Sequence, residues 1–295
     1  MPVWRPRREW LTVALRSVLG QRGTRIELIV VDDGCEEPVA SMLSEFDDPR
    51  LRVVRIDHAG PAGARNAGIA EARGEWFRFA DADDALELDS TARLLQLAAD
   101  GEWITYGATV YCDAHLRPRS KLVERRSGWL ARECLLGRFR VMLPAILFPR
   151  RVVEETGGWE ASLAGTRDWD FVLRCLERAR ARGEPEVALY YRRYEGSTSS
   201  ALAAGLDGAR RVVERYFERH PDERARLGRP ASAMLDVIAA DQATHGRPWR
   251  SARFWRAGIR DPGAIGHDLA ELAARRTRRI LRRPTVIDEP PFDGA

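Results

Sequence analysis

Apolar and polar positions follow one another in the first third of the chain as they do in strands joined by helices. Apolar runs with the length of buried strands occur at residues 26–31, 51–56 and 76–80. Apolar residues at helical spacing occur at residues 10–19, 39–46 and 64–72. Short strands that alternate with helices predict β-α units and a mostly parallel sheet flanked by helices. The pattern therefore predicts an α/β fold.

The middle of the chain continues the mixed pattern with longer spacings. Further strands are expected at residues 102–112, 145–148 and 186–191. Further helices are expected at residues 89–99, 127–136, 150–156 and 166–181. Between them, the basic stretch at residues 117–126 is expected to be an exposed loop.

The last third of the chain is helical in pattern. From residue 205 onward, helix breaks are expected at Pro221, Pro230, Pro248 and Pro262. We expect one domain over residues 1–200, with halves at 1–100 and 101–200, and a helical extension over residues 201–295.

Carboxylates follow two of the expected strands. The run Asp81-Ala82-Asp83-Asp84 comes directly after residues 76–80, and Asp32-Asp33-Gly34 follows the strand at 26–31. Clustered carboxylates repel one another unless a positive charge lies among them. Mg²⁺ or Mn²⁺ takes oxygen ligands and keeps positions open for phosphate oxygens, and α/β sheets bind ligands at the ends of parallel strands. These acids predict a site for a nucleotide diphosphate and a metal; a solvated turn with an Asp cap is the alternative.

A series of motifs in the same order resembles family 2 glycosyltransferases of the GT-A fold. The motifs lie at residues 17–21, 27–34, 64–68, 74–75, 81–84, 157–160, 168–174 and 191–193. They cover the chain from residue 2 to about residue 200. The resemblance implies a Rossmann-like sheet and an inverting transfer of a sugar from a nucleotide diphosphate sugar. It also implies that residues 1–100 are the nucleotide-sugar-binding half and residues 101–200 the acceptor half.

The resemblance also implies roles for the acids and for one arginine. Asp33 would hydrogen-bond the nucleotide base, and a carboxylate suits the imide N–H of uracil or thymine, whereas Asp32 is expected to be structural. Arg65 would lie at the nucleotide, Asp81 at the ribose or base, and Asp83 at the metal. The alternatives are a turn role for Asp33, and an ion pair of Arg65 with Asp81 or Asp83.

Asp168 occupies the position of the expected general base, with Asp170 as the next candidate. In this chain Arg167 precedes Asp168, where the family usually has glutamate. The alternative role for Asp168 is that of a helix N-cap. Near Tyr194 the family often carries a histidine that can bind the metal. Because tyrosine replaces it poorly, coordination would rest on Asp83, diphosphate and water.

The N-terminal segment departs most from the family pattern. Family members open with an apolar strand, and this sequence begins Met1-Pro2-Val3-Trp4-Arg5, which aligns with the end of that opening segment. The first strand is therefore expected to be missing and the chain to start too late. The same alignment places Val3 in the nucleotide-sugar site.

Composition limits the location and the partners. The 295 residues carry a net charge of +4. The positive charge comes almost wholly from arginine, since Lys121 is the only lysine. We therefore do not expect a nucleic-acid partner. Four cysteines without paired metal spacing, and the lack of an apolar run of about 18 residues, favour a reducing cytoplasm. The basic stretch at 268–281 is expected to be a solvated helix face or, alternatively, a peripheral contact with the inner face of the membrane.

The predicted function is that of an inverting, metal-dependent glycosyltransferase with UDP- or dTDP-sugars favoured and Mn²⁺ or Mg²⁺ as cofactor. A sugar-phosphate nucleotidyltransferase is disfavoured because no glycine-rich, Arg/Lys-bearing signature lies near the first strand. A catalytically weak sugar-nucleotide-binding protein with a degenerate GT-A domain is the other alternative. The acceptor is left open among glycans, lipid-linked sugars and small molecules.

Overall fold

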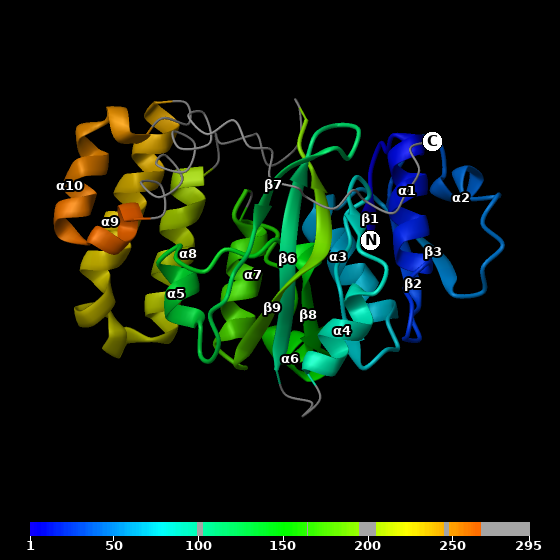
Figure 1. Cartoon of the computed structure of the whole chain (residues 1–295), viewed down its shortest axis with the longest axis horizontal. Coiled ribbons are helices and arrows are strands. Elements are labelled where there is room, and N and C mark those ends of the chain that lie inside the picture. The colour runs from blue at the N-terminus through cyan, green and yellow to red at the C-terminus, as the bar shows by residue number, and fades with distance from the viewer. Residues whose placement is uncertain (99–102, 164, 195–204, 245–247, 267–295) are drawn as a thin grey trace.

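The computed structural model describes residues 1–98, 103–163, 165–194, 205–244 and 248–266. In these residues a small parallel sheet and a larger mixed sheet lie side by side with helices around them (Figure 1). The small sheet has the order β1-β2-β3 and consists of β1 (Pro2–Val3), β2 (Leu28–Asp33) and β3 (Leu51–Ile56). Its helices are α1 (Arg8–Leu19), α2 (Val39–Met42) and α3 (Gly60–Glu71). This part is the series of parallel β-α units that the hydrophobic pattern predicts.

The two-residue strand β1 occupies the place that was expected to lack a strand. Pro2 and Val3 pair in parallel with Val31 and Asp32 of β2. The amino group of Met1 donates to the carbonyl of Ile29, which extends the pairing by one hydrogen bond. The expectation that the first strand is missing was therefore wrong, because the chain forms a first strand of two residues.

The larger sheet is mixed, and most of its strand pairs are antiparallel. Its order is β4-β8-β6-β9-β5, with β7 paired to β6, and only β6 and β9 run parallel among the described residues. The strands are β4 (Trp76–Phe77), β5 (Ala85–Leu86), β6 (Ile104–Cys112), β7 (Pro118–Leu122), β8 (Ile146–Pro149) and β9 (Ala181–Arg192). The parallel arrangement therefore describes β1 to β3, whereas the strand expected at 76–80 belongs to the mixed sheet as β4 and pairs antiparallel with β8.

Strand β7 lies where an exposed loop was expected, so that expectation was wrong. Along β7, half-buried positions alternate with the exposed Arg119 and Lys121. This is the pattern of an edge strand with charges toward solvent, and those charges disguised it as a loop. The strand pairs antiparallel with β6.

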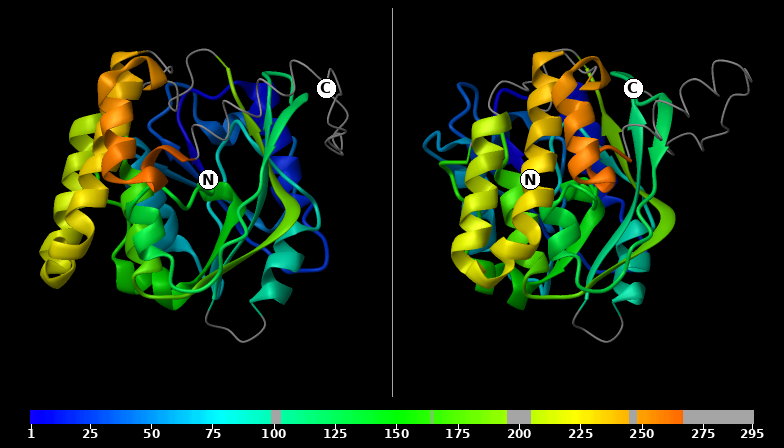
Figure 2. Two further views of the ribbon diagram at one scale, coloured as in Figure 1. Left: turned by 60° about the vertical axis from the view of Figure 1, so that its left-hand side comes forward. Right: turned by 90° about the vertical axis from the view of Figure 1, so that its left-hand side faces the viewer.

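Helices cover the larger sheet and continue past it. They are α4 (Ser90–Leu97), α5 (Ala131–Leu135), α6 (Arg150–Thr156), α7 (Arg167–Leu176), α8 (Gly205–Arg219), α9 (Arg224–Ala243) and α10 (Ala252–Arg260). Figure 2 shows α8, α9 and α10 gathered on one flank of the molecule, away from β2 and β3 in Figure 1. The break expected at Pro230 was wrong because α9 runs through it. Residues 268–281 lie outside the described residues.

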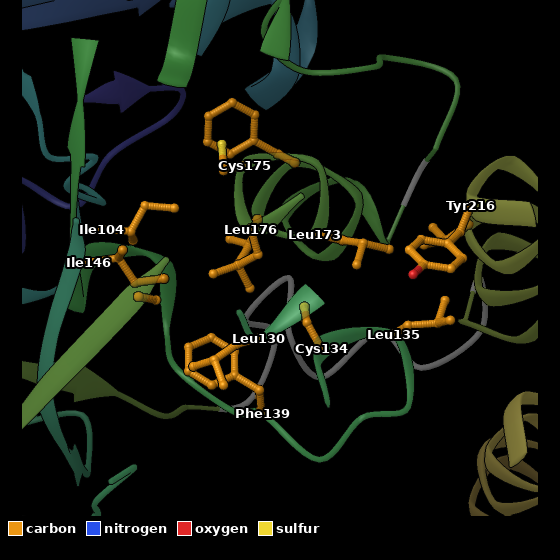
Figure 3. Close-up of a cluster of buried hydrophobic side chains, with 14 of the residues drawn as sticks. Ile104, Leu130, Cys134, Leu135, Phe139, Ile146, Leu173, Cys175, Leu176 and Tyr216 are labelled. Atoms are coloured by element: carbon orange, nitrogen blue, oxygen red, sulfur yellow. The ribbon is translucent and has the colours of Figure 1, made fainter. Parts of the chain in front are cut away.

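Helix α7 is packed between the larger sheet and α8. Ile104 and Ile146 of the sheet face one side of α7, and Tyr216 of α8 lies on its other side, with Leu173 and Leu176 between them (Figure 3). All five side chains are at most 2% exposed. Burying such side chains stabilises the fold by about 1.5–3 kcal/mol each, so α7 is held in place from both sides. None of the described helices has the length and apolarity needed to cross a membrane.

Candidate functional site

A cavity of about 450 Å³ opens where the end of β2, the start of α3, the segment before β5 and the start of α7 come together. It is lined by all six residues that the sequence predicts for the site: Val3, Asp33, Arg65, Asp81, Asp83 and Asp168. The segment between β1 and α1 forms part of its wall with Trp4, Arg5 and Arg7. Side chains that are distant in the sequence therefore share one solvent-accessible space.

The two acids that end β2 have different surroundings. Asp32 is buried, accepts hydrogen bonds from the backbone N–H groups of Cys35 and Val39, and pairs with Arg55 at 2.8 Å. Burial by itself would raise the pKa of Asp32, but these hydrogen bonds and the arginine outweigh it and lower the pKa. Asp32 is structural, as expected, because it ties the loop after β2 to the start of α2.

Asp33 lines the cavity and also fixes the next turn of the chain. Its Oδ1 accepts the N–H of Ala59 at 2.7 Å, and its Oδ2 lies 3.0 Å from Nδ1 of His58. Gly34 has φ +73°, and a Cβ there would lie 2.9 Å from the nitrogen of His58. The close approach of these two loops therefore requires glycine after Asp33.

Arg65 bridges two carboxylates in the wall of the cavity. It is 7% exposed, and its Nη2 donates to Asp81 at 2.8 Å while its Nη1 donates to Asp168 at 2.9 Å. The alternative role for Arg65, an ion pair with Asp81 or Asp83, is therefore present in the structure through Asp81, and Asp168 is a second partner. Burial raises the pKa of Asp81, and the positive charge of Arg65 opposes that rise.

Asp168 stands in the first turn of α7 with its side chain 48% exposed. Its Oδ1 accepts hydrogen bonds from Nη1 of Arg65 and from the indole Nε1 of Trp159, the latter at 3.0 Å. Arg167 also lines the cavity but forms no ion pair within the part of the chain that the structure describes. Asp170, the second candidate base, is fully buried, pairs with Arg174 at 2.7 Å and does not line the cavity, so it is placed less well for this role than Asp168.

Asp83 has a different partner from the other cavity acids. The hydroxyl of Tyr194 donates to Oδ2 of Asp83 at 3.0 Å, and Nε of Arg192 donates to its carbonyl at 2.7 Å. The neighbouring Asp84 is buried and accepts the backbone N–H of Arg192. Burial raises the pKa of Asp84 well above its ordinary value, and the charges of Asp83 and Asp81 add to the rise.

The carboxylate oxygens in the cavity suit a divalent cation that takes few of its ligands from the protein. Asp81 and Asp83 place carboxylates in the same space. Among the described residues, no three His, Cys, Asp or Glu side chains gather in an arrangement suited to a metal ion. Mg²⁺ is usually bound through one or two carboxylates and completed by water and substrate phosphates. The residues fit that kind of site rather than an all-protein cage.

Several residues in or next to the cavity received no binding or catalytic role from the sequence. Trp159 does not line the cavity but contacts Asp168. Its position in the motif at residues 157–160 was the one signal that could have marked it. Tyr194 was expected to be a poor metal ligand, and the structure gives it a hydrogen bond to Asp83 instead. Trp4 and Trp10 line the cavity, and Trp4 is 50% exposed.

Residues 1–145 match the sequence model of the family described as glycosyl transferase family 2. The match covers 145 of the 295 residues of the chain. Over 86 residues it is 40% identical to the succinoglycan biosynthesis protein ExoO of Rhizobium meliloti, a stretch that covers 29% of this chain and 25% of that protein. Over 93 residues it is 33% identical to the putative glycosyltransferase EpsH of Bacillus subtilis, covering 31% of this chain and 27% of that protein. The matches thus span about a quarter of the length of these relatives.

The fold of this chain is similar to that of a solved structure of low sequence identity. The crystal structure of residues 1–349 of S. aureus TarS in complex with UDP-GlcNAc aligns with a TM-score of 0.58 and 13% identity. The alignment covers 98% of this chain and 94% of that one. The GT-A fold expected from the sequence motifs is therefore confirmed.

Proposed function

We propose that this chain is an inverting, metal-dependent glycosyltransferase that transfers a sugar from a nucleotide diphosphate sugar to an acceptor hydroxyl. The observation that carries the proposal is the single cavity lined by Asp33, Arg65, Asp81, Asp83 and Asp168. The match of residues 1–145 to the glycosyl transferase family 2 model supports it, as does the UDP-GlcNAc complex of the similarly folded TarS.

The donor would lie along the wall formed by β1, β2 and α3. Asp33 is an acceptor suited to the imide N–H of uracil or thymine, which favours UDP- and dTDP-sugars over other donors. Val3 lies beside it in the cavity wall. Arg65 contributes a positive charge that complements a diphosphate, and Asp81 accepts hydrogen bonds from donor hydroxyl groups.

The transfer would take place at the start of α7. Asp168 accepts the proton of the acceptor hydroxyl as that oxygen forms its bond to the anomeric carbon of the donor. The bond between the anomeric carbon and the diphosphate oxygen breaks, and its electron pair leaves with the nucleotide diphosphate. Because attack and departure occur on opposite faces, a single displacement inverts the configuration.

Asp83 would hold the cation, with Asp81 also offering a carboxylate in the cavity. When bound, Mn²⁺ or Mg²⁺ supplies positive charge that stabilises the developing charge on the leaving diphosphate. The hydroxyl of Tyr194 keeps one oxygen of Asp83 in a fixed position, which leaves the other for the cation.

Thermal shift with a panel of UDP-, dTDP- and GDP-sugars tests the donor class directly. In the presence of Mn²⁺ we expect a rise in melting temperature with a UDP- or dTDP-sugar, and a smaller rise for Asp33→Ala. Equal shifts with all three classes, or none, would contradict the assigned base contact.

A catalytically weak sugar-nucleotide-binding protein is the second candidate, and one observation favours it. Asp168 and Asp81 are both paired with Arg65, so the carboxylate assigned as base already has a cationic partner. Such a protein would bind the donor and not turn it over. Measuring donor hydrolysis with and without Mn²⁺ separates the two candidates.

A further inference from the structure

Trp159 makes a specific contact with the carboxylate assigned as base. The side chain is 4% exposed, and its indole Nε1–H donates to Oδ1 of Asp168 at 3.0 Å. Its ring stacks on Phe171 with centroids 3.6 Å apart and planes at 13°, and it meets the edge of Phe79 at 4.5 Å. The indole is therefore fixed in the core while its one polar atom points to the cavity wall.

The backbone of Trp159 is fixed as firmly as its ring. The side-chain amide of Asn66 donates to the carbonyl of Trp159 at 3.0 Å and accepts its N–H at 2.8 Å. Gly158 has φ +79°, and a Cβ there would lie 2.4 Å from Oδ1 of Asn66. Arg174 of α7 donates to the carbonyl of Gly158 at 2.8 Å. The loop can take this conformation only with glycine before the tryptophan.

The two donors on Asp168 differ in what else they do. Arg65 also pairs with Asp81, and its charge is available to a donor diphosphate. Trp159 is neutral and is held by Phe171 and Asn66, so its contact does not depend on the state of the cavity. Both donors reach Oδ1, and Oδ2 of Asp168 forms no hydrogen bond within the described residues.

We propose that Trp159 is the positioning residue of the transfer reaction. Its indole N–H fixes one oxygen of Asp168, which keeps the other oxygen free for the proton of the acceptor hydroxyl. A carboxylate without this contact would turn about its side-chain bonds and spend less time in the reactive orientation. The inference rests on the proposed role of Asp168 as base.

The kinetic test compares two tryptophans that each donate one indole hydrogen bond. Trp159→Phe keeps an aromatic ring on Phe171 and removes the N–H. Trp169→Phe, in the same helix as Asp168, removes an indole N–H that donates to the carbonyl of Cys134 at 2.9 Å and does not contact the Asp168 carboxylate. We expect kcat to fall about 10- to 100-fold for Trp159→Phe, the range for losing a hydrogen bond to a charged group, with donor KM unchanged. Trp169→Phe should leave kcat unchanged.

A spectroscopic test gives a result even if the turnover of the chain is too slow to measure. The nine tryptophans give indole N–H signals in a ¹⁵N-labelled sample, and the two Trp→Phe variants assign those of Trp159 and Trp169. Asp168→Asn replaces the charged acceptor with a neutral one and should move the Trp159 signal upfield while the Trp169 signal stays in place. An unmoved Trp159 signal would overturn the inference whether or not the chain is an active transferase.

Combining the two substitutions separates this inference from the proposed function. If Trp159 acts through Asp168, Trp159→Phe should lower kcat much less in the Asp168→Asn background than in the natural sequence. An equal fall in both backgrounds would overturn the positioning role while leaving Asp168 as the base. A natural kcat for Asp168→Asn alone would overturn both the base assignment and the inference.

Discussion

Arg65 and Asp168 are 103 positions apart in the chain, and their side chains meet at 2.9 Å in the wall of the cavity. The same guanidinium holds Asp81 at 2.8 Å with its other terminal nitrogen. One buried cation therefore connects an acid of the expected donor side with the acid assigned as base. A planar fork can make both contacts at once, which a point charge on a flexible stem does less well.

Arg65→Lys tests the importance of this bridge. We expect the variant to bind the donor about 10- to 100-fold more weakly and to melt at a lower temperature, because lysine cannot span both carboxylates and leaves one poorly paired. Isothermal titration with UDP and Mn²⁺, together with a melting curve, measures both effects. Arg55→Lys, which alters an arginine paired with Asp32 and not with a cavity acid, is the matched control. Undiminished UDP affinity in Arg65→Lys would contradict a role for the guanidinium at the nucleotide.

Asp83→Ala should abolish metal-dependent transfer while the fold stays intact. The substitution removes the carboxylate proposed to hold the cation and also relieves its repulsion with Asp81 and Asp84. Turnover across a Mn²⁺ titration, with the melting temperature as a check of folding, measures the effect. Asp89→Ala, which removes an acid at the start of α4 outside the cavity lining, should behave like the natural chain. Near-normal turnover of Asp83→Ala in Mn²⁺ would show that the metal carboxylate was assigned wrongly.

Asp32→Asn tests the structural role of the first acid after β2 through its pH dependence. The pKa of Asp32 is lowered in the folded protein, so its ionised form stabilises the fold above the unfolded pKa of about 3.8 and loses this effect as the pH falls through the folded pKa. We expect the substitution to lower the free energy of unfolding by about 2 kcal/mol at pH 7. The difference between variant and natural chain should shrink below pH ~4. A difference that stays constant from pH 7 to pH 3 would contradict the ionised contact.

Part of the fold could be predicted because local pattern determines it. Strand β3 lies at residues 51–56, where the hydrophobic pattern predicts a strand. The acids after the other predicted strands could be assigned to a site because α/β sheets bind ligands at strand ends. The edge strand β7 was not predicted because its charged residues hide a two-residue period. Helix α9 continues through Pro230 although an interior proline costs about 3 kcal/mol. Ala231 and Met234, which lie near Pro230 in the chain, are buried, and their packing offsets the cost of the proline. The sequence shows the proline but not this packing.

The candidate site, like the fold, could be predicted only in part from the sequence. The six predicted residues line one cavity. They could be predicted because five of them belong to motifs that can be recognised locally, and Val3 follows from the alignment of the N-terminal segment. Which acids Arg65 pairs with depends on how α3 and α7 meet, and no local pattern reports this. For the same reason the contact of Trp159 with Asp168 could be seen only in three dimensions, although the two residues are only nine positions apart.

The central claim is that the cavity catalyses transfer from a nucleotide diphosphate sugar with Asp168 as base. The most direct measurement is release of the nucleotide diphosphate from a panel of donor sugars in Mn²⁺, for the natural chain and for Asp168→Asn, beside donor affinity from titration. We predict release from a UDP- or dTDP-sugar that requires Mn²⁺, falls by about 10²- to 10⁴-fold in Asp168→Asn, and leaves the donor affinity nearly unchanged. Donor binding without release from any sugar of the panel, or equal release by the variant, would contradict the account.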